Sequence, residues 1–125
     1  MLMAAALIPH DDKGAKEAVL VAKHGCGFTL FPSNATQPDG KRYGYSVADS
    51  AWRNGQGDVA RDFLNSMNKA NISTGFYYSL GGSTYAGWEQ WSAEQLIEVE
   101  KQQLTELWST YGNLDHGGHS EVRVE

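Results

Sequence analysis

The chain has 125 residues and a net charge of -5, which arises from 10 basic and 15 acidic side chains. A hydrophobic fraction of 41% and a charged fraction of 20% are typical of one small globular domain. The acidic balance argues against a nucleic-acid or anionic-membrane partner, because such surfaces are basic. The single cysteine, Cys26, excludes an internal disulfide framework and a zinc site built on several thiolates.

The amino-terminal segment gives no convincing targeting signal. Residues 1–8 are apolar, but no Lys or Arg precedes them, and a membrane span needs about 20 apolar residues. The localisation therefore stays open. Two sequons, at Asn34 and Asn71, would matter only in a secreted protein.

Two apolar runs predict parallel strands. Residues 17–22 form the first run, which ends at Lys23-His24-Gly25, and residues 74–80 form the second, which ends at Gly81-Gly82. Both runs are rich in β-branched or aromatic residues, and the first is apolar on both faces, as in a strand of a parallel sheet.

Two helices are expected, one between these strands and one after them. Asp58 can cap the first helix, whose apolar stripe comprises Val59, Phe63, Met67 and Ala70. Ser92 and Gln95 form a capping-box pattern at the start of the second, and Gly112 suits its end. On the second helix we expect one buried face, made of Ala93, Ile97, Leu104, Leu107, Trp108 and Tyr111.

This order of elements predicts an α/β fold with parallel strands and right-handed crossovers. The tail over residues 113–125 is polar and rich in Gly and His, so we expect it to be disordered.

Long loops follow both strands, over residues 25–57 and 81–91. Sites in α/β folds form at the carboxyl ends of strands, where both loops emerge. Eight aromatic residues of these loops would either bind a ligand with an apolar face and a hydroxylated rim, such as a sugar, or anchor the loops. They are Phe28, Phe31, Tyr43, Tyr45, Trp52, Tyr85, Trp88 and Trp91.

His24 and the pair Tyr77-Tyr78 are the candidate site residues at these strand ends. His24 directly follows the first strand, and the two tyrosines must point to opposite faces of the second. The alternative for His24 is a structural hydrogen bond to the backbone, and for each tyrosine it is packing in the core.

Other constellations are incomplete. Ser33 or Ser79 with His24 lacks a nucleophile elbow, and Gly81-Gly82-Ser83 lacks the lysine of a phosphate loop. His116 and His119 lack a third metal ligand. Hydrolysis of a glycoside needs two carboxyl groups that flank the scissile bond. None of the acidic residues in the long loops ends a strand; they are Asp39, Asp49 and Glu89.

Several consecutive motifs resemble the α-L-fucosidases of glycoside hydrolase family 29. The stretches are 18–24 (AVLVAKH), 27–33 (GFTLFPS), 45–47 (YSV), 52–55 (WRNG), 57–59 (GDV) and 74–79 (TGFYYS), followed by 104–107 (LTEL) and 111–112 (YG). They occur in the family's order and cover roughly residues 14–114.

This resemblance implies a partial (β/α)8 barrel of about two βα units, with residues 1–16 as a remnant of the preceding helix and turn. It also implies an exo-acting retaining hydrolase of terminal α-L-fucose, without metal or cofactor, whose substrate is a fucosylated glycan. A carboxylate nucleophile and a second carboxyl group, acting as acid and then base, perform the reaction. At matching positions, His24 and Tyr77 would bind fucose.

The chain departs from the family pattern in two places. Gly25 and Cys26 stand where the family usually has a second histidine and an aspartate. No apolar strand follows the last helix to carry the nucleophile, and Asp115 lies too close to that helix to be assigned. We therefore expect no catalytic residue in this chain, and a role as a fucosidase fragment that pairs with the rest of the barrel. The alternatives are a non-catalytic fucose- or glycan-binding module and an inactive pseudo-enzyme fragment.

Overall fold

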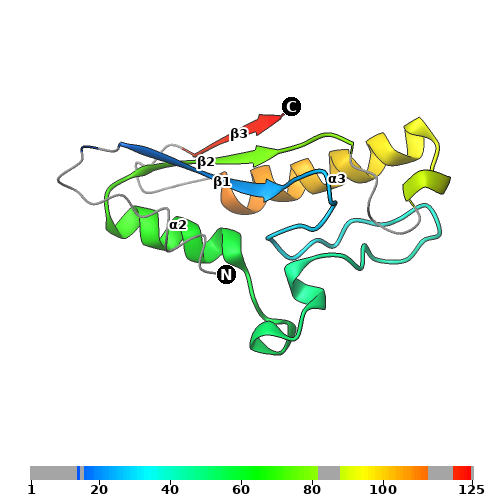
Figure 1. Ribbon diagram of the computed structural model, residues 1–125, viewed down its shortest axis with the longest axis horizontal. Coiled ribbons are helices and arrows are strands. Elements are labelled where there is room, and N and C mark those ends of the chain that lie inside the picture. Colours follow the sequence, from blue (N-terminus) through cyan, green and yellow to red (C-terminus); the bar gives the residue numbers. More distant parts are fainter. Residues whose placement is uncertain (1–13, 15, 82–87, 113–119, 125) are drawn as a thin grey trace.

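The computed structural model describes residues 14, 16–81, 88–112 and 120–124. Three parallel strands lie in the order β1-β2-β3, with bounds Glu17–Lys23, Ser73–Tyr78 and Ser120–Val124. Two long helices, α2 (Val59–Lys69) and α3 (Ala93–Tyr111), lie together below the sheet in Figure 1. The expected α/β class with parallel strands is confirmed. A closed barrel needs eight strands, so the partial barrel stays a prediction.

The side chains of the strands alternate between two unlike faces. Leu20 of β1 and Phe76 of β2 are partners in the ladder and are buried on the helix side. Val21 and Tyr77, the next pair, point to the opposite face, where Val21 is 38% exposed. Both described helices pack on one face only, so this alternation separates a closed core from an open face.

Helix α2 follows the sequence expectation. The Asp58 carboxylate accepts the Arg61 N–H at 2.9 Å and so caps the first turn. Val59, Phe63 and Met67 are buried against the sheet, as their helical spacing predicts. Met67 and Phe63 therefore form the centre of the layer between α2 and the strands.

Helix α3 begins as expected but is rotated relative to the expected face. The Ser92–Gln95 capping box is present at its start. However, Ile97 and Trp108 are 48% and 64% exposed, so their assignment to the buried face was wrong. Leu107 and Tyr111 are buried as expected, and the rest of the buried face consists of Val99, Glu100 and Gln103. Glu100 and Gln103 are polar, which is why a hydrophobic pattern could locate only part of this face.

Two expectations were wrong for residues 120–124: this part of the tail is not disordered, and a strand, β3, does follow the last helix and lies beside β2. Phe76 pairs with Val122, and Val122 packs against the core. Residues 120–124 read SEVRV, and their alternation of apolar and polar side chains suits a strand with one covered face. Residues 113–119, like most of the expected helical remnant at 1–16, lie outside the described residues.

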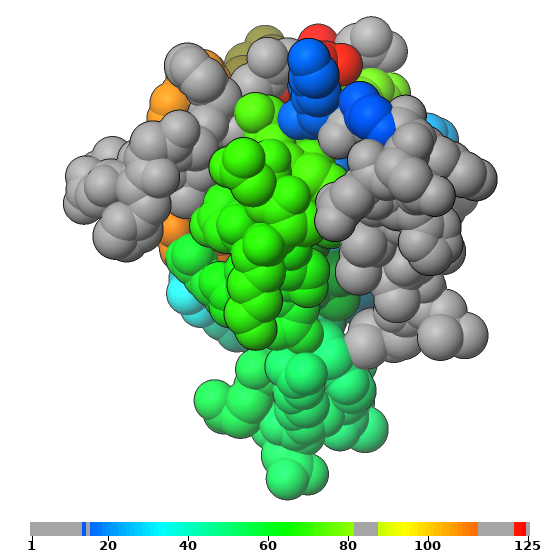
Figure 2. Space-filling view, turned by 90° about the vertical axis from the view of Figure 1, so that its left-hand side faces the viewer, coloured from blue at the N-terminus to red at the C-terminus, as the bar shows by residue number. Residues whose placement is uncertain are grey.

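The loop after β1 is long but ordered by short helical turns. It contains η2 (Val47–Asp49) and η3 (Trp52–Gly55), and this part projects beyond the amino-terminal end of α2 (Figures 1 and 2). Arg53 and Asn54 adopt left-handed backbone angles, with φ of 49° and 54°. The side chain of Trp52 lies directly over Gly57, so that any Cβ at this glycine would collide with the ring. A third short turn, η4 (Trp88–Gln90), precedes α3.

None of the helices among the described residues is long and apolar enough to cross a membrane.

Candidate functional site

His24 and Tyr77 meet at the carboxyl ends of the first two strands. Their ring centroids are 6.1 Å apart, with an angle of 28° between the planes. His24 is exposed and Tyr77 is half-buried, so both rings are accessible on the open face of the sheet. The structure thus brings the two candidate side chains together, although their role toward a ligand stays a prediction.

An irregularity at the end of β1 directs His24 to this face. Val21 pairs with Tyr77 and Lys23 pairs with Tyr78, so two residues of β1, Ala22 and Lys23, lie opposite one residue of β2. Such a bulge shifts the alternation of the side chains by one. As a result Ala22 and Lys23 are both buried, and His24 is exposed.

The Lys23 ammonium group is buried among acceptors and rings. Its Nζ donates to the carbonyl oxygens of Ser79 and Gly81 at 2.8 and 2.7 Å, and lies 3.5 Å from Glu100 Oε1. It also lies 4.6 Å from the centre of the Tyr78 ring. Burial lowers the pKa of Lys23, and the neighbouring Glu100 carboxylate opposes that shift.

Tyr78 belongs to the core, as the packing alternative for this pair stated. Its hydroxyl donates to Gln103 Oε1 at 2.6 Å, and the side chain is fully buried. Burial, together with the charge of Glu100, raises the pKa of Tyr78 well above its usual value. The two adjacent tyrosines therefore have different environments, one in the core and one beside His24.

Most of the loop rings anchor the loops. Tyr43 is buried, packs edge-on against Trp88 at 6.2 Å, and donates its hydroxyl to the Gly27 carbonyl at 2.6 Å. Trp88 stacks on Trp91 at 5.5 Å. Phe31 is buried in the core against Tyr111. The sugar-binding interpretation is therefore wrong for the buried rings Phe31, Tyr43 and Trp88.

The remaining loop rings lie nearer the surface. Tyr45 is 36% exposed and packs edge-on against the half-buried Phe28 at 5.1 Å. Trp52 lies under the Arg53 guanidinium at 4.5 Å. Tyr85 lies outside the described residues.

Several side chains of the incomplete motifs stabilise loops. Ser33 is buried and donates to Glu106 at 2.9 Å, so it is no free nucleophile. Asp49 caps η2 and pairs with Arg42. Asp39 accepts the Lys41 N–H at 2.9 Å, a contact that lowers the pKa of its carboxyl group.

Phosphate or metal binding gains no support from the described residues. The Gly81 N–H donates to Glu100 Oε1 at 2.5 Å and so is not free for a phosphate. Among the residues that the structure describes, no three His, Cys, Asp or Glu side chains gather as a metal site. His116 and His119 lie outside this part of the chain.

Gly25 and Cys26 occupy a turn directly after His24. The Gly27 N–H donates to the His24 carbonyl at 3.0 Å and closes this turn. Cys26 is exposed, and a Cβ built at Gly25 meets no heavy atom within 4 Å. The space around a Cβ at position 25 is therefore open.

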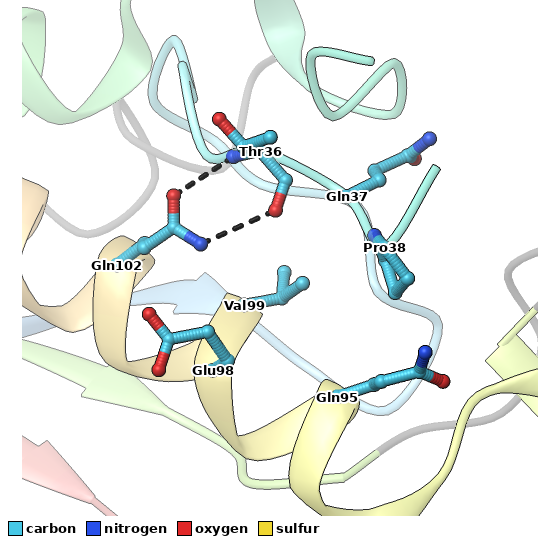
Figure 3. Close-up of a pocket in the computed structure, with 7 residues that line it drawn as sticks. All are labelled: Thr36, Gln37, Pro38, Gln95, Glu98, Val99 and Gln102. Atoms are coloured by element: carbon cyan, nitrogen blue, oxygen red, sulfur yellow. Dashed lines mark hydrogen bonds between the residues drawn. The ribbon is translucent and has the colours of Figure 1, made fainter. Parts of the chain in front are cut away.

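A pocket of about 380 Å³ lies elsewhere, between the loop and α3. Figure 3 shows Gln102 reaching the backbone N–H and carbonyl of Thr36, at 2.8 and 3.2 Å. The residues that line the pocket are Thr36, Gln37, Pro38, Gln95, Glu98, Val99 and Gln102. Neither His24 nor Tyr77 is among them, and the central amide is already used to hold the loop, so we do not regard this pocket as the candidate site.

Sequence reasoning missed Lys23 and Glu100. The available signal was a charged residue at the last position of an apolar strand, followed at once by a candidate site histidine. Glu100 gave no such signal, because a carboxylate in the middle of an amphipathic helix usually faces solvent.

Taken together, the molecule is a parallel α/β unit with a polar, ring-bearing rim at the carboxyl ends of its strands, the edge where α/β enzymes bind ligands. The model of the family named Alpha-L-fucosidase matches residues 6–116. The chain therefore belongs to the α-L-fucosidase family.

Relatives and solved structures agree with this assignment. The chain is 36% identical over 105 residues to Alpha-L-fucosidase 1 of Arabidopsis thaliana, a match that covers 82% of this chain and 19% of that protein. A candidate α-L-fucosidase from Bacteroides thetaiotaomicron superposes with a TM-score of 0.71 and 27% identity, over 99% of this chain and 27% of that structure. A glycoside hydrolase family 29 member from a rumen bacterium gives a TM-score of 0.69 and 26% identity, over 92% of this chain and 18% of that structure. The chain thus spans about a fifth of the curated relatives it matches.

Proposed function

We propose that this chain is part of the catalytic barrel of an exo-acting α-L-fucosidase, and that it supplies contacts to the fucose ring. The observation that carries the proposal is the stacked contact of His24 and Tyr77 at the rim, at 6.1 Å. Family membership supports the substrate class, a terminal α-L-fucose of a glycan or glycoside.

The chemistry of the two rings suits a deoxy sugar. An aromatic ring offers an apolar face for the C–H groups and the methyl group of fucose, and the tyrosine hydroxyl and imidazole nitrogens can bond its hydroxyls. Because the rings lie at the open face, a sugar can reach them without displacing core side chains.

The reaction itself is proposed to be double displacement with retention, through a carboxylate nucleophile and a second carboxyl group. We assign neither role to a residue of this chain. Of the acidic side chains in the loops, Asp39 holds a turn, Asp49 caps η2, and Glu89 lies exposed in η4. We accordingly expect no hydrolysis of an aryl α-L-fucoside by the chain alone, and enzyme-dependent turnover that His24→Ala abolishes would overturn this.

Binding of L-fucose to the chain tests the proposal. Titration followed by NMR or calorimetry should give saturable binding of L-fucose, with weaker binding of its enantiomer. His24→Ala should weaken the affinity by about tenfold, the effect of losing one or two hydrogen bonds or ring contacts. Trp108→Ala is the matched control, because this ring is 64% exposed on α3 and should not affect the affinity.

The alternatives differ in this titration and in an assay of turnover by the complete barrel. Binding without turnover in a complete barrel would favour a non-catalytic fucose-binding module. Equal binding by wild type and His24→Ala would refute the assignment of the rim. No binding of L-fucose would refute it as well and would favour an inactive fragment.

A further inference from the structure

The buried ammonium group of Lys23 lies where β1 and β2 end. Lys23 is the last residue of β1, and its ammonium group donates to the carbonyls of Ser79 and Gly81, which directly follow β2. The Lys23 side chain thus links the carboxyl ends of two strands. His24 follows the first strand, and Tyr77 belongs to the second.

We propose that Lys23 is a positioning residue of the rim: its buried ammonium group holds the bulge of β1 and thereby turns His24 toward Tyr77. The inference deepens the proposed function, since it concerns the same site. Lys23 itself is 1% exposed and does not touch a ligand on the open face.

The alternation of side chains carries the argument. Leu20 points into the core and Val21 points to the open face, so regular alternation would send Ala22 inward, Lys23 outward and His24 inward. The register shift between Val21 and Lys23 reverses the last two positions. Burial of a lysine ammonium group is costly unless hydrogen-bond acceptors surround it, and here three acceptors do so.

Glu100 completes the same cluster from α3. Its Oε1 lies 3.5 Å from the Lys23 ammonium and accepts the Gly81 N–H at 2.5 Å. Gly81 is therefore held through both its N–H and its carbonyl, with φ of 72°. The rings of Tyr78 and Trp88 lie 4.6 and 4.7 Å from the ammonium and shield it from water.

The test compares wild type with the double variant Lys23→Met/Glu100→Gln. This pair removes the ammonium without leaving a buried carboxylate unpaired, and it retains an oxygen that can accept the Gly81 N–H. We expect loss of the nuclear Overhauser effects between the His24 and Tyr77 rings, and a dissociation constant for L-fucose raised by at least about tenfold.

Phe63→Leu is the matched control, since it disturbs the core beside α2 and no group of the cluster. It should lower the unfolding midpoint while keeping the ring contact and the affinity. The proposal is overturned if the double variant folds and keeps both, or if Phe63→Leu loses both at an equal loss of stability.

Two measurements separate this inference from the proposed function and from a folding defect. If wild type does not bind L-fucose, the proposed function fails, and the ring contact alone still decides the role of Lys23. If the double variant does not fold, the wild-type spectrum decides: the proposal requires a slowly exchanging Lys23 ammonium signal close to Gly81 and Tyr78. A rapidly exchanging, solvent-exposed ammonium would refute it.

Discussion

The two faces of the sheet show what decides the role of a residue in this molecule. Tyr77 and Tyr78 are neighbours of the same type, yet Tyr78 is fully buried under α3 and bonded to Gln103, whereas Tyr77 stands beside an exposed histidine. On the helix side, apolar packing and satisfied polar groups maintain the fold. On the other side, Val21 and His24 are exposed and are therefore accessible from solvent.

The largest expected difference between the faces concerns Phe76. This ring packs against Phe63 at 6.1 Å and against Tyr111 at 5.8 Å, and is completely buried. Phe76→Ala should lower the free energy of unfolding by about 3–5 kcal/mol, the range for a large ring removed from a core. Denaturant titration measures it, and a loss below about 1 kcal/mol would mean that the core is not packed as described.

Alkaline pH should lower the free energy of unfolding through two buried tyrosines on the helix side of the sheet. Burial raises the pKa of both Tyr78 and Tyr111, and the hydrogen bond to Asp58 reinforces the shift for Tyr111. In the unfolded chain these hydroxyls ionise near pH 10, so stability is retained below that pH and falls by about 1.4 kcal/mol per pH unit for each tyrosine above it. Lys23, with its lowered pKa, acts in the opposite direction only up to about pH 10.5, where the unfolded lysine also titrates.

Thermal unfolding between pH 9 and 11.5 checks this expectation. Tyr111→Phe should remove about half of the alkaline loss, because one of the two buried hydroxyls is absent. A curve that does not change with this substitution would show that other groups govern the alkaline limit.

A matched pair of hydroxyl deletions sharpens the comparison further. Tyr78→Phe leaves Gln103 Oε1 without the donor that lies 2.6 Å away, at an expected cost of about 1–3 kcal/mol for a buried polar atom. Tyr77→Phe should stay within about 0.5 kcal/mol of wild type, because this half-buried side chain lies on the open face and outside the core. Chemical denaturation of both variants is the measurement, and equal losses would remove the distinction between the faces.

A gain of affinity is expected at position 25. The resemblance puts a histidine there in the family, and a side chain at Gly25 meets no atom within 4 Å of its Cβ. Gly25→His should therefore strengthen the binding of L-fucose by about 0.5–1.5 kcal/mol, the contribution of one hydrogen bond. Calorimetric titration tests it, with Gly25→Ala as the control that fills space without adding a donor; equal affinity of both variants would contradict the expectation.

The smallest effect is expected on the open face itself. Val21→Thr is nearly isosteric and places a hydroxyl at a position that is 38% exposed, so the free energy of unfolding should change by less than about 0.5 kcal/mol. A loss of 2 kcal/mol or more, measured by the same denaturation, would mean that this face is covered in solution and that the two faces are alike.

Local signals in the sequence predicted much of the fold. The apolar runs located β1 and β2, and the capping residues Asp58 and Ser92 located the starts of both helices. These signals act between residues close in the chain, so they survive without tertiary context.

The parts that sequence reasoning missed depend on distant partners. The buried face of α3 contains Glu100 and Gln103, and only the groups they meet, Lys23 and Tyr78, explain that burial. Strand β3 is short and half polar, so it becomes visible only through its pairing with β2. At the site, His24 and Tyr77 could be named from the resemblance, whereas the bulge that brings them together could not.

The order of the strands also has a consequence for handling the protein. Within the described sheet, the outer margins of β1 and β3 have no neighbouring strand, so their main-chain amides and carbonyls along those margins can pair with a further polypeptide. Concentrated samples should accordingly self-associate by extension of the sheet, and a short peptide of complementary register would compete with that association.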